Sequence, residues 1–461
     1  MTQQALDILR RVSESAEVQK LSDALRADAE LYLVGGTVRD AFAGGQVHDL
    51  DCASLLFPDE IRARLEGAGI HCVPTGLKHQ TVTAVVSEGG ANIEITTFRG
   101  PGMDPKGGVS ASSSIEEDLR YRDFTINALA YSPASRRVVD PHGGLEDLQR
   151  KVVRAPGSPD DRFREDPLRV LRMIRFASRT GFTVDAATFH AAAKFVEELR
   201  SVSVERIRDE HSKTLLADQP DRGLRMYFEL GILTLLFPEI AAFVGFEQNE
   251  FHKDDLFEHT LEVIRRTPPD LALRLAALLH DVGKPASLSF HPDTGARRFF
   301  RHESIGAEMS VDFLRRLRYP RSLTEEVVLL VETHMRPIEA GPGGLRRLLR
   351  DTGESFDRWR ILKEADAAST KLEHSELLRR LAEFDAAMAE VKKGPAVSPL
   401  KSLAVNGNDL LALGVTPGPR VGVLLRALHE KVLDDPSLNE RETLLALVPE
   451  LETVSVTLEK G

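Results

Sequence analysis

The sequence has little of what marks exported, membrane-bound or disulfide-stabilised proteins. Two cysteines, Cys52 and Cys72, are too few for a disulfide framework, so we expect both to be buried as small hydrophobic residues in a reducing cytoplasm. No stretch approaches the roughly 20 apolar residues that a membrane span needs. The N-terminus has a helical pattern but no export signal. We therefore predict a cytoplasmic protein with no membrane partner, and no segment indicates a protein partner.

The chain also lacks the net positive charge of proteins that coat nucleic acids nonspecifically. Its formal net charge is −11 at pH 7, whereas neutralising phosphates requires clustered Lys and Arg. One local cluster has the opposite sign, with six arginines between Arg162 and Arg179. The composition excludes general coating of nucleic acid but leaves this segment for a local contact.

The chain is too long for a single hydrophobic core. At roughly 150 residues per domain, its 461 residues predict about three domains. Runs rich in Val, Ile, Leu or Thr predict strands in the first part, and helical periodicity dominates from about residue 146. We expect an α+β protein in which a small mixed β-sheet with helices precedes all-α regions. The predicted strands cover 31–34, 47–53, 80–86 and 92–99, and the predicted regions cover 1–145, 146–236, 237–375 and 376–461.

A glycine pair follows the first predicted strand, in the segment LYLVGGTVRDAF. Gly35 and Gly36 let the backbone approach a ligand closely, and we expect Thr37 to cap the helix that follows. The N-terminus of a helix can bind phosphate through its free N–H groups. The pair alone is weak evidence, because the spacings of Rossmann and P-loop motifs are absent.

Acidic residues on two of the predicted strands indicate a metal site. On a strand, Asp49 and Asp51 of HDLDCAS point to one face, and two such carboxylates would repel unless a cation neutralised them. Mg²⁺ bound by carboxylates and substrate phosphates suits nucleotidyl transfer. In NIEITTFR, Glu94 is a candidate third acid. A solvated strand end is the commoner interpretation of an isolated D-x-D or of one strand acid.

Polar residues also interrupt the apolar segment IEEDLRYRDFTINALAY. Arg122 suits a triphosphate or a ribose hydroxyl, and Asp123 and Asn127 suit ordering that arginine or hydrogen-bonding the backbone. These three residues are therefore candidates for nucleotide binding.

The arginine-rich segment predicts a helix with a charged face. Asp166 before Pro167 is a good N-cap with proline at the first helical position. A carboxylate acceptor with a guanidinium donor suits the recognition of a base edge. The alternative is a solvated, salt-bridged stripe, and we favour nucleotide and RNA contact. The arginines on one broad face are Arg169, Arg172, Arg175 and Arg179.

Histidines and aspartates recur at helical positions between residues 237 and 375. They occur in the order H, HD, H, H, D, with 20, 20, 31 and 31 residues between successive sites. Imidazole and carboxylate ligands suit transition metals such as Mn, Fe, Co or Ni, which can activate water for phosphate-ester hydrolysis. A lone histidine is usually structural, but this ordered set is not explained that way. We name as the histidine–aspartate cluster His259, His280, Asp281, His302, His334 and Asp366.

Five motifs in succession resemble those of a known family. The segments GGTVRDAF…HDLDCAS, LRYRDFTINALAY, DPHGGLEDL, REDPLRVLRMIRFASR and SVERIRDEHSKTLL are similar to the motifs of class II tRNA nucleotidyltransferases, the CCA-adding enzymes, and of their poly(A) polymerase relatives. The resemblance spans about residues 30 to 240. It implies a nucleotidyltransferase head followed by a helical neck, body and tail. The implied partners are the tRNA 3′ end, CTP and, for addition of the full CCA, ATP.

The resemblance also implies roles for individual residues. Asp49 and Asp51 would hold two metals that activate the tRNA 3′-hydroxyl and bridge the nucleotide phosphates. Gly35, Gly36 and Arg39 would help to hold the triphosphate.

Further residues would contact the ribose and the base. Arg122 and Asp123 would lie at the ribose, and Asp166 and Arg169 would hydrogen-bond the base, so that protein side chains replace a nucleic-acid template.

Two departures from the family pattern bear on specificity. Tyr121-Arg122 stands where relatives usually have a basic pair. The loop from Gly100 to Ser114 is short and has neither arginine nor aromatic residue, as in family members that add only CC. We therefore expect addition of C, either CC or the full CCA. A poly(A) polymerase, or a phosphohydrolase whose head only binds RNA, are the alternatives.

The histidine–aspartate cluster resembles the ligand set of the HD phosphohydrolase superfamily. This resemblance implies a metal-dependent phosphodiesterase or phosphatase. A helical scaffold that binds tRNA is the alternative. The segment from Val405 to Asp435 also resembles the tail that follows such domains and predicts a tRNA contact.

Overall fold

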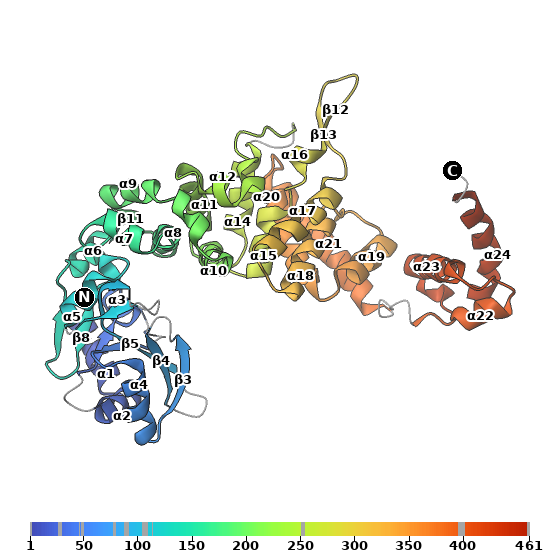
Figure 1. The fold of residues 1–461 in the computed structure, drawn as a ribbon. Coiled ribbons are helices and arrows are strands. Elements are labelled where there is room, and N and C mark those ends of the chain that lie inside the picture. Colours follow the sequence, from blue (N-terminus) through green and yellow to red (C-terminus); the bar gives the residue numbers. More distant parts are fainter. Residues whose placement is uncertain are drawn as a thin grey trace. The chain divides into compact units, whose positions relative to one another are not determined.

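The computed structural model describes residues 2–25, 30–45, 47, 50–76, 80–86, 92–103, 109–112, 114–249, 254–394 and 402–458. The chain divides into two compact units, Met1–Leu235 and Leu236–Gly461 (Figure 1). The first holds a mixed sheet followed by helices, and the second is mostly helical. The expected α+β class is therefore confirmed. None of the described helices is long and apolar enough to cross a membrane.

The first unit is built on a seven-stranded sheet of order β3-β4-β5-β2-β1-β8-β9. The pairing of β2 with β5 is parallel and the other pairings are antiparallel, so the sheet is mixed as predicted. The four predicted strands correspond to β1, β2, β4 and β5, whereas β3, β8 and β9 were not predicted. The bounds are β1 Tyr32–Val34, β2 Leu50–Ser54, β3 His71–Gly76, β4 Thr81–Val85, β5 Asn92–Thr97, β8 Ala130–Ser132 and β9 Arg137–Val139.

Helices cover the sheet and complete its core. Leu33 and Val38 are fully buried in one cluster with residues of the first four helices. Cys52 and Cys72 are free and buried, which confirms their expected role as small hydrophobic residues. The helical elements are α1 Thr2–Ser13, α2 Ala16–Leu25, α3 Gly36–Phe42, α4 Pro58–Gly67, α5 Ile115–Arg120, the 3-10 turn η2 Thr125–Asn127 and α6 Gly144–Arg150.

Two local predictions in this region were wrong. Helix α3 starts at Gly36, because the positive φ of 60° at Gly35 turns the chain directly into the helix. Thr37 therefore lies inside the first turn, where its Oγ1 accepts the Asp51 amide at 2.8 Å. The segment expected to be a loop contains a short hairpin of β6 (Arg99–Met103) and β7 (Val109–Ala111), with 104–108 and 113 outside the described residues.

A group of helices completes the first unit. Helix α8 buries one apolar face against α10 and α11. Gly223 permits this packing, since a Cβ there would lie 2.4 Å from the Thr214 side chain and 2.6 Å from that of Ser178. The elements are α7 Pro159–Glu165, α8 Arg169–Thr180, α9 Ala186–Lys194, α10 Val204–Leu215, α11 Pro220–Glu229 and α12 Ile232–Leu236, with the short parallel pair β10 Val152–Val153 and β11 Thr183–Val184.

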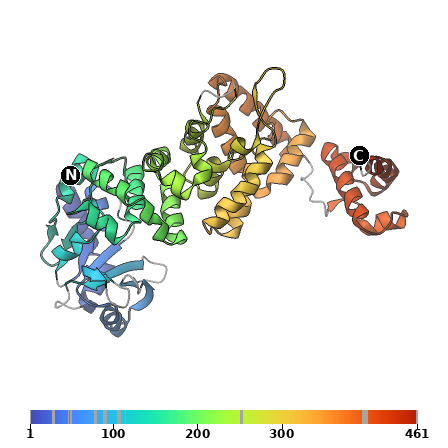
Figure 2. The ribbon, with the colours of Figure 1, turned by 45° about the horizontal axis from the view of Figure 1, so that its top comes forward.

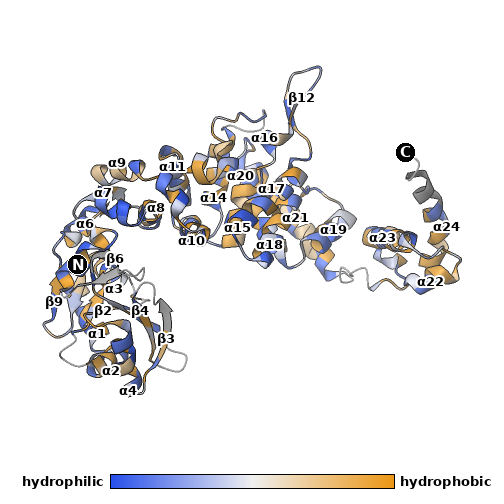
Figure 3. Cartoon of the chain, in the orientation of Figure 1, coloured by the Kyte–Doolittle hydropathy of each residue, from blue (hydrophilic) through white to orange (hydrophobic). Residues whose placement is uncertain are grey.

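The second unit is organised around the buried helix α15. Its sequence LALRLAALL is almost entirely buried, and Figure 3 shows apolar residues along it. Gly283 follows α15 and packs against α17, because a Cβ there would lie 2.2 Å from the His302 carbonyl oxygen. The elements are α13 Pro238–Ala241, α14 Leu256–Arg266, α15 Leu271–Leu279, α16 Lys284–Ser287, β12 Leu288–Phe290, β13 Arg297–Phe299, α17 His302–Arg316, α18 Arg321–Thr333, α19 Pro342–Thr352, α20 Phe356–Ala368 and α21 His374–Lys393.

The C-terminal helices have a core of their own, centred on Leu424, Leu428 and Leu444. Figure 2 shows them as a separate group at the red end of the chain. Arg347 of α19 binds Glu430 at 2.6 Å and Asp434 at 2.8 Å. The elements are α22 Gly407–Ala412, α23 Pro419–Asp434 and α24 Arg441–Leu458.

Candidate functional sites

The glycine pair forms a cradle for charged side chains. A Cβ on Gly36 would lie 3.1 Å from Asp51 Oδ2, and one on Gly35 would lie 3.0 Å from Arg122 Nη1 and 3.7 Å from Asp51 Oδ2. A side chain at either glycine would therefore occupy the space beside a carboxylate and a guanidinium. The close approach of this backbone to a ligand stays a prediction.

The structure describes two of the three acids that were predicted to bind metal. Asp51 lies on β2 directly opposite Glu94 in the parallel β2–β5 register, so the two residues share a face of the sheet. Asp49 lies outside the described residues. The roles of all three as metal ligands stay predictions.

A buried polar chain links α3 to α8. Arg39 Nη1 donates to Asn127 Oδ1 at 2.6 Å, and Asn127 Nδ2 donates to Asp123 Oδ1 at 2.9 Å. Arg172 then donates to Asp123 Oδ2 at 2.9 and 2.5 Å. Burial alone would raise the pKa of Asp123, but Arg172 and Asn127 outweigh it and hold that pKa well below its usual value. Predicted residues from three segments therefore form one network.

Two acids in this region were missed by sequence reasoning. Asp118 Oδ2 accepts from Arg122 Nε and Nη2 at 3.0 and 2.9 Å, and Oδ1 accepts the Arg99 amide at 2.9 Å. The i, i+4 spacing from Asp118 to Arg122 was the available signal. Glu210 of α10 pairs with Arg175 at 2.8 Å, although this contact lacks hydrogen-bond geometry.

The arginine face of α8 is mostly salt-bridged within the protein. Arg175 is largely covered and lies 4.5 Å from the centre of the Phe176 ring. Burial lowers the pKa of Arg175, with Glu210 opposing it. Arg169, Arg172 and Arg175 are thus held by carboxylates of the protein, whereas Arg179 is exposed. Their contact with nucleotide or RNA stays a prediction.

The two residues predicted to read the base, Asp166 and Arg169, have partners within the protein. Asp166 Oδ2 accepts from Arg206 at 2.7 Å, and Arg169 Nη2 donates to the Tyr121 carbonyl at 2.8 Å. The predicted N-cap at Asp166 was wrong, since α8 starts at Arg169. The chain is extended at Asp166, as expected before Pro167, and a turn precedes the helix.

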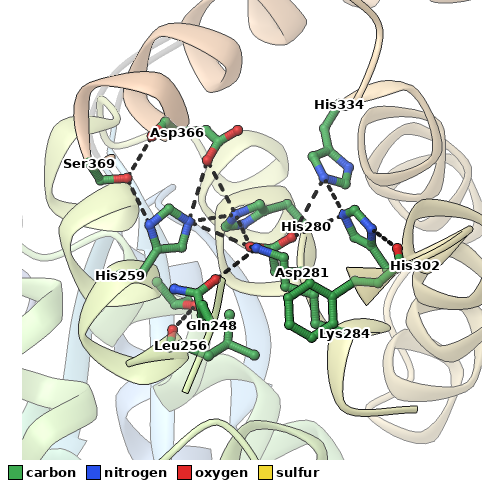
Figure 4. A network of polar contacts seen from close by, with 12 residues as sticks. Gln248, Leu256, His259, His280, Asp281, Lys284, His302, His334, Asp366 and Ser369 are labelled. Atoms are coloured by element: carbon green, nitrogen blue, oxygen red, sulfur yellow. Dashed lines mark hydrogen bonds and ion pairs between the residues drawn. The ribbon is translucent and has the colours of Figure 1, made fainter. Parts of the chain in front are cut away.

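The structure brings all six residues of the histidine–aspartate cluster together (Figure 4). Asp281 lies between two histidine pairs. Its Oδ2 is 3.1 Å from His280 Nε2 and 3.5 Å from His259 Nε2. Its Oδ1 is 3.3 Å from His302 Nε2 and 3.7 Å from His334 Nε2. One carboxylate therefore faces both pairs.

The sixth residue joins one of these pairs. Asp366 Oδ1 lies 3.4 Å from His259 Nε2 and 3.9 Å from His280 Nε2. The cluster thus has two sides that share the Asp281 carboxylate. One side adds His259, His280 and Asp366, and the other adds His302 and His334.

Backbone carbonyls orient three of the four imidazole rings. The Nδ1 atoms of His280, His302 and His334 lie 2.9, 2.8 and 2.6 Å from carbonyl oxygens of Ala277, Phe299 and Val331. A carbonyl only accepts, so each Nδ1 carries a proton, and Nε2 is the ligand atom when the ring is neutral.

The fourth imidazole is oriented by a side chain that sequence reasoning missed. Ser369 Oγ donates to the Asp366 carbonyl at 2.7 Å and lies 3.0 Å from His259 Nδ1. Because the hydroxyl proton is used, Ser369 accepts from Nδ1. All four Nε2 atoms therefore converge on the carboxylates as potential metal ligands.

The electrostatics of the cluster favour a cation. Burial lowers the pKa of His259, but Asp281 and Asp366 outweigh it and raise the pKa to about 9. Asp281 Oδ1 is buried and has no hydrogen-bond partner among the described residues. A buried carboxylate oxygen without a hydrogen bond is costly unless a cation pairs with it. The donor set and this oxygen fit a divalent transition metal.

Lys284 is a further neighbour of the cluster. Its Nζ lies 2.6 Å from Asp281 Oδ2 and donates to Gln248 Oε1 at 2.7 Å. The spacing of HDVGKP, which puts lysine three residues after the aspartate, was a signal for this contact.

Family models match three parts of the chain. The Poly A polymerase head domain matches residues 31–154, the probable RNA and SrmB-binding site of polymerase A matches 181–244, and the HD domain matches 256–371. An A-adding tRNA nucleotidyltransferase of Deinococcus radiodurans is 36% identical over 417 residues, which cover 86% of this chain and 90% of that protein. The chain belongs to the class II tRNA nucleotidyltransferases.

Other members of the family are similar over comparable lengths. A CC-adding tRNA nucleotidyltransferase of Thermus thermophilus is 31% identical, covering 87% of this chain and 89% of the relative. The solved CCA-adding enzyme of Bacillus stearothermophilus, in complex with CTP, is 26% identical with a TM-score of 0.67 and covers 99% and 98% of the two chains. This tRNA nucleotidyltransferase therefore combines a polymerase head with an HD domain, as the motifs predicted.

Proposed function

We propose that this nucleotidyltransferase adds C or A from CTP or ATP to the tRNA 3′ end without a nucleic-acid template. The observation that carries the proposal is the cradle in which Gly35 and Gly36 approach Asp51 and Arg122. The CTP complex of the Bacillus stearothermophilus relative supports a nucleoside triphosphate as substrate.

In this proposal Asp49 and Asp51 would hold Mg²⁺, with Glu94 beside them. Bound Mg²⁺ supplies neutralisation of the triphosphate and activation of the attacking 3′-hydroxyl. The glycine pair admits the triphosphate, and Arg39 and Arg122 carry positive charge beside it.

The neck residues would choose the incoming base. Asp166 accepts and Arg169 donates, which is the chemistry that distinguishes C or A from U or G. Arg206 and Glu165, which contact these two residues, hold the pair in position.

Two observations favour different answers to the question of which nucleotides the enzyme adds. The short loop between Gly100 and Ser114, without arginine or aromatic residue, favours addition of C only. The identity of 36% with an A-adding relative, against 31% with a CC-adding one, favours addition of the terminal A.

The test is to incubate the protein with tRNAs that end before CCA, after C and after CC, with CTP or ATP supplied separately, and to sequence the 3′ ends. Extension of the first two tRNAs to CC supports the C-adding range, and extension of tRNA-CC alone with ATP supports the A-adding range. Long A tails on generic RNA would indicate a poly(A) polymerase. Absence of any extension would refute the proposal.

We further propose that the histidine–aspartate cluster is a metal-dependent phosphoesterase that acts on nucleotides or RNA ends. The buried Asp281 Oδ1 without a hydrogen bond carries this proposal. Mn, Fe, Co or Ni bound to these ligands would supply an activated water at neutral pH. Bound metal measured by mass spectrometry should fall in Asp281→Asn and His302→Gln but not in His374→Gln, an exposed histidine. Equal metal content in all three variants would refute the site.

A further inference from the structure

A hairpin beside the histidine–aspartate cluster carries exposed aromatic side chains. It consists of β12 and β13, and Figure 1 shows it projecting from the helices of its unit. Phe290 and Phe300 are 60% and 66% exposed. Single exposed apolar residues are common, so Phe300, directly after β13, indicates a contact surface only together with the charged groups beside it.

The arginines of the hairpin differ in their partners. Arg297 binds the side chain of Glu247 at 2.6 Å. Arg298 lies 5.5 Å from the centre of the Phe300 ring, and neither Arg298 nor Arg301 has a carboxylate partner among the residues that the structure describes. In a chain of net charge −11, these two guanidinium groups are available to an external anion.

The same segment is tied to the cluster. The Phe299 carbonyl accepts from His302 Nδ1 at 2.8 Å, and the buried Phe299 ring lies 5.7 Å from Lys284 Nζ. Arg301 has a left-handed φ of 59° directly before α17, a conformation that is uncommon for residues other than glycine. The chain therefore turns sharply between the exposed Phe300 and the buried ligand His302.

An exposed ring with adjacent guanidinium groups matches the chemistry of single-stranded RNA. Bases stack on aromatic rings and arginines pair with phosphates, with little dependence on base sequence. We propose that Phe300, Arg298 and Arg301 bind the terminal nucleotides of a single-stranded RNA and present them to the histidine–aspartate cluster. The presentation step rests on the proposed phosphoesterase, whereas the binding step does not.

The two phenylalanines provide a matched pair of reporters. In the β12–β13 register Phe290 pairs with Arg297 and Leu288 with Phe299, so Phe290 lies on the opposite face of the hairpin from Arg298. The chain has one tryptophan, Trp359, which is fully buried. A tryptophan at position 300 or 290 therefore reports locally on base stacking.

The experiment titrates full-length Phe300→Trp with the single-stranded RNA hexamer A6 in EDTA, which prevents turnover. We expect saturable quenching in this variant and less than half as much in Phe290→Trp. Adding Arg298→Gln and Arg301→Gln should weaken binding about tenfold and lower the slope of log affinity against log salt by about 1.4, as for two phosphate contacts. The control Arg321→Gln, at an exposed arginine of the same unit, should change neither. No quenching in Phe300→Trp, or unchanged affinity in the double arginine variant, would overturn the binding site.

Measurements of hydrolysis distinguish the proposed presentation of RNA from the proposed phosphoesterase activity of the cluster. With Mn²⁺, the double arginine variant should hydrolyse 3′-phosphorylated A6 about tenfold more slowly, but bis(p-nitrophenyl) phosphate at the wild-type rate. If the double arginine variant and the wild type hydrolyse 3′-phosphorylated A6 at equal rates, the proposed presentation of RNA to the cluster is wrong. If the wild type hydrolyses neither substrate, the phosphoesterase proposal fails, while the quenching result still decides whether the hairpin binds RNA.

Discussion

The nucleotidyltransferase site in the head and the histidine–aspartate cluster hold their charged groups in different ways. In the cluster, backbone carbonyls and one hydroxyl fix every imidazole, so the ligands are oriented before any metal binds. In the first unit, arginines and acids pair with one another across several elements, as Arg172 of α8 does with Asp123. The proposed roles follow this difference, with a small cation in the cluster and a large anionic substrate in the first unit.

The largest expected effect is the separation of the two activities. Asp51→Asn removes a carboxylate from the head and should lower nucleotidyl transfer at least about 10³-fold, because catalysis by bound metal needs that charge. Phosphoesterase activity should not change. Asp281→Asn should give the reverse pattern, and both rates are measured on one preparation of each variant. Loss of both activities in either variant would contradict the independence of the sites.

The buried chain in the first unit should be costly to break. Asp123→Ala leaves Arg172 and Asn127 without their shared acceptor and should destabilise the unit by about 3–5 kcal/mol. Urea unfolding measures the change. The exposed pair Asp409–Arg441 is the control, since Asp409→Ala should cost less than about 1 kcal/mol. Similar costs in both variants would argue against the chain as a structural element.

The cradle can be tested with two glycines that share a positive φ. Gly35 has φ 60° and a Cβ there would lie 3.0 Å from Arg122, whereas Gly44 has φ 77° and nothing within 4 Å. Alanine with a positive φ should cost about 1–2 kcal/mol of stability at either position. Only Gly35→Ala should lower kcat/KM for the nucleotide, by about 10²-fold, as a small misplacement of positioning groups does. An equal loss of kcat/KM in Gly44→Ala would assign the effect to backbone strain.

The smallest expected effect concerns a histidine outside the cluster. Burial lowers the pKa of His211 to about 3 from its ordinary 6.5. Below pH 6.5 the unfolded chain binds a proton that the folded chain does not, so stability falls as the pH drops from 6.5 towards 3. The contribution at pH 5 is about 2 kcal/mol. His211→Phe should remove this part of the pH dependence of unfolding, whereas the exposed His374→Gln should leave it.

The residues of the histidine–aspartate cluster were predicted from the sequence more completely than the contacts of the head. The order H, HD, H, H, D predicted the six residues of the cluster because each lies in a short local motif on a helix or directly after one. In the head, contacts such as Arg39–Asn127, separated by 88 residues, depend on how the sheet brings segments together. Local patterns also missed β3, β8 and β9, since two of these strands have only three residues.

Residues that orient others were the hardest to predict. Ser369 and Glu210 were not predicted, although Glu210 lies in the motif SVERIRDEHSKTLL, because their importance comes from what lies beside them in space. Thr37 was assigned as a cap because threonine is a common N-cap, but the positive φ of Gly35 placed the N-cap two positions earlier, at Gly35 itself. N-cap propensity describes a residue in isolation, whereas here the backbone conformation of a neighbouring glycine determined where the helix begins.

The contact at Gly283 changes how copies of this domain should be judged in other genomes. Counting the six ligands is the natural way to decide whether a copy is functional, yet Gly283 contributes no ligand atom. A methyl group there would displace the start of α17, and with it His302. A homologous sequence that keeps all six residues of the cluster but replaces this glycine should therefore be classed as non-functional.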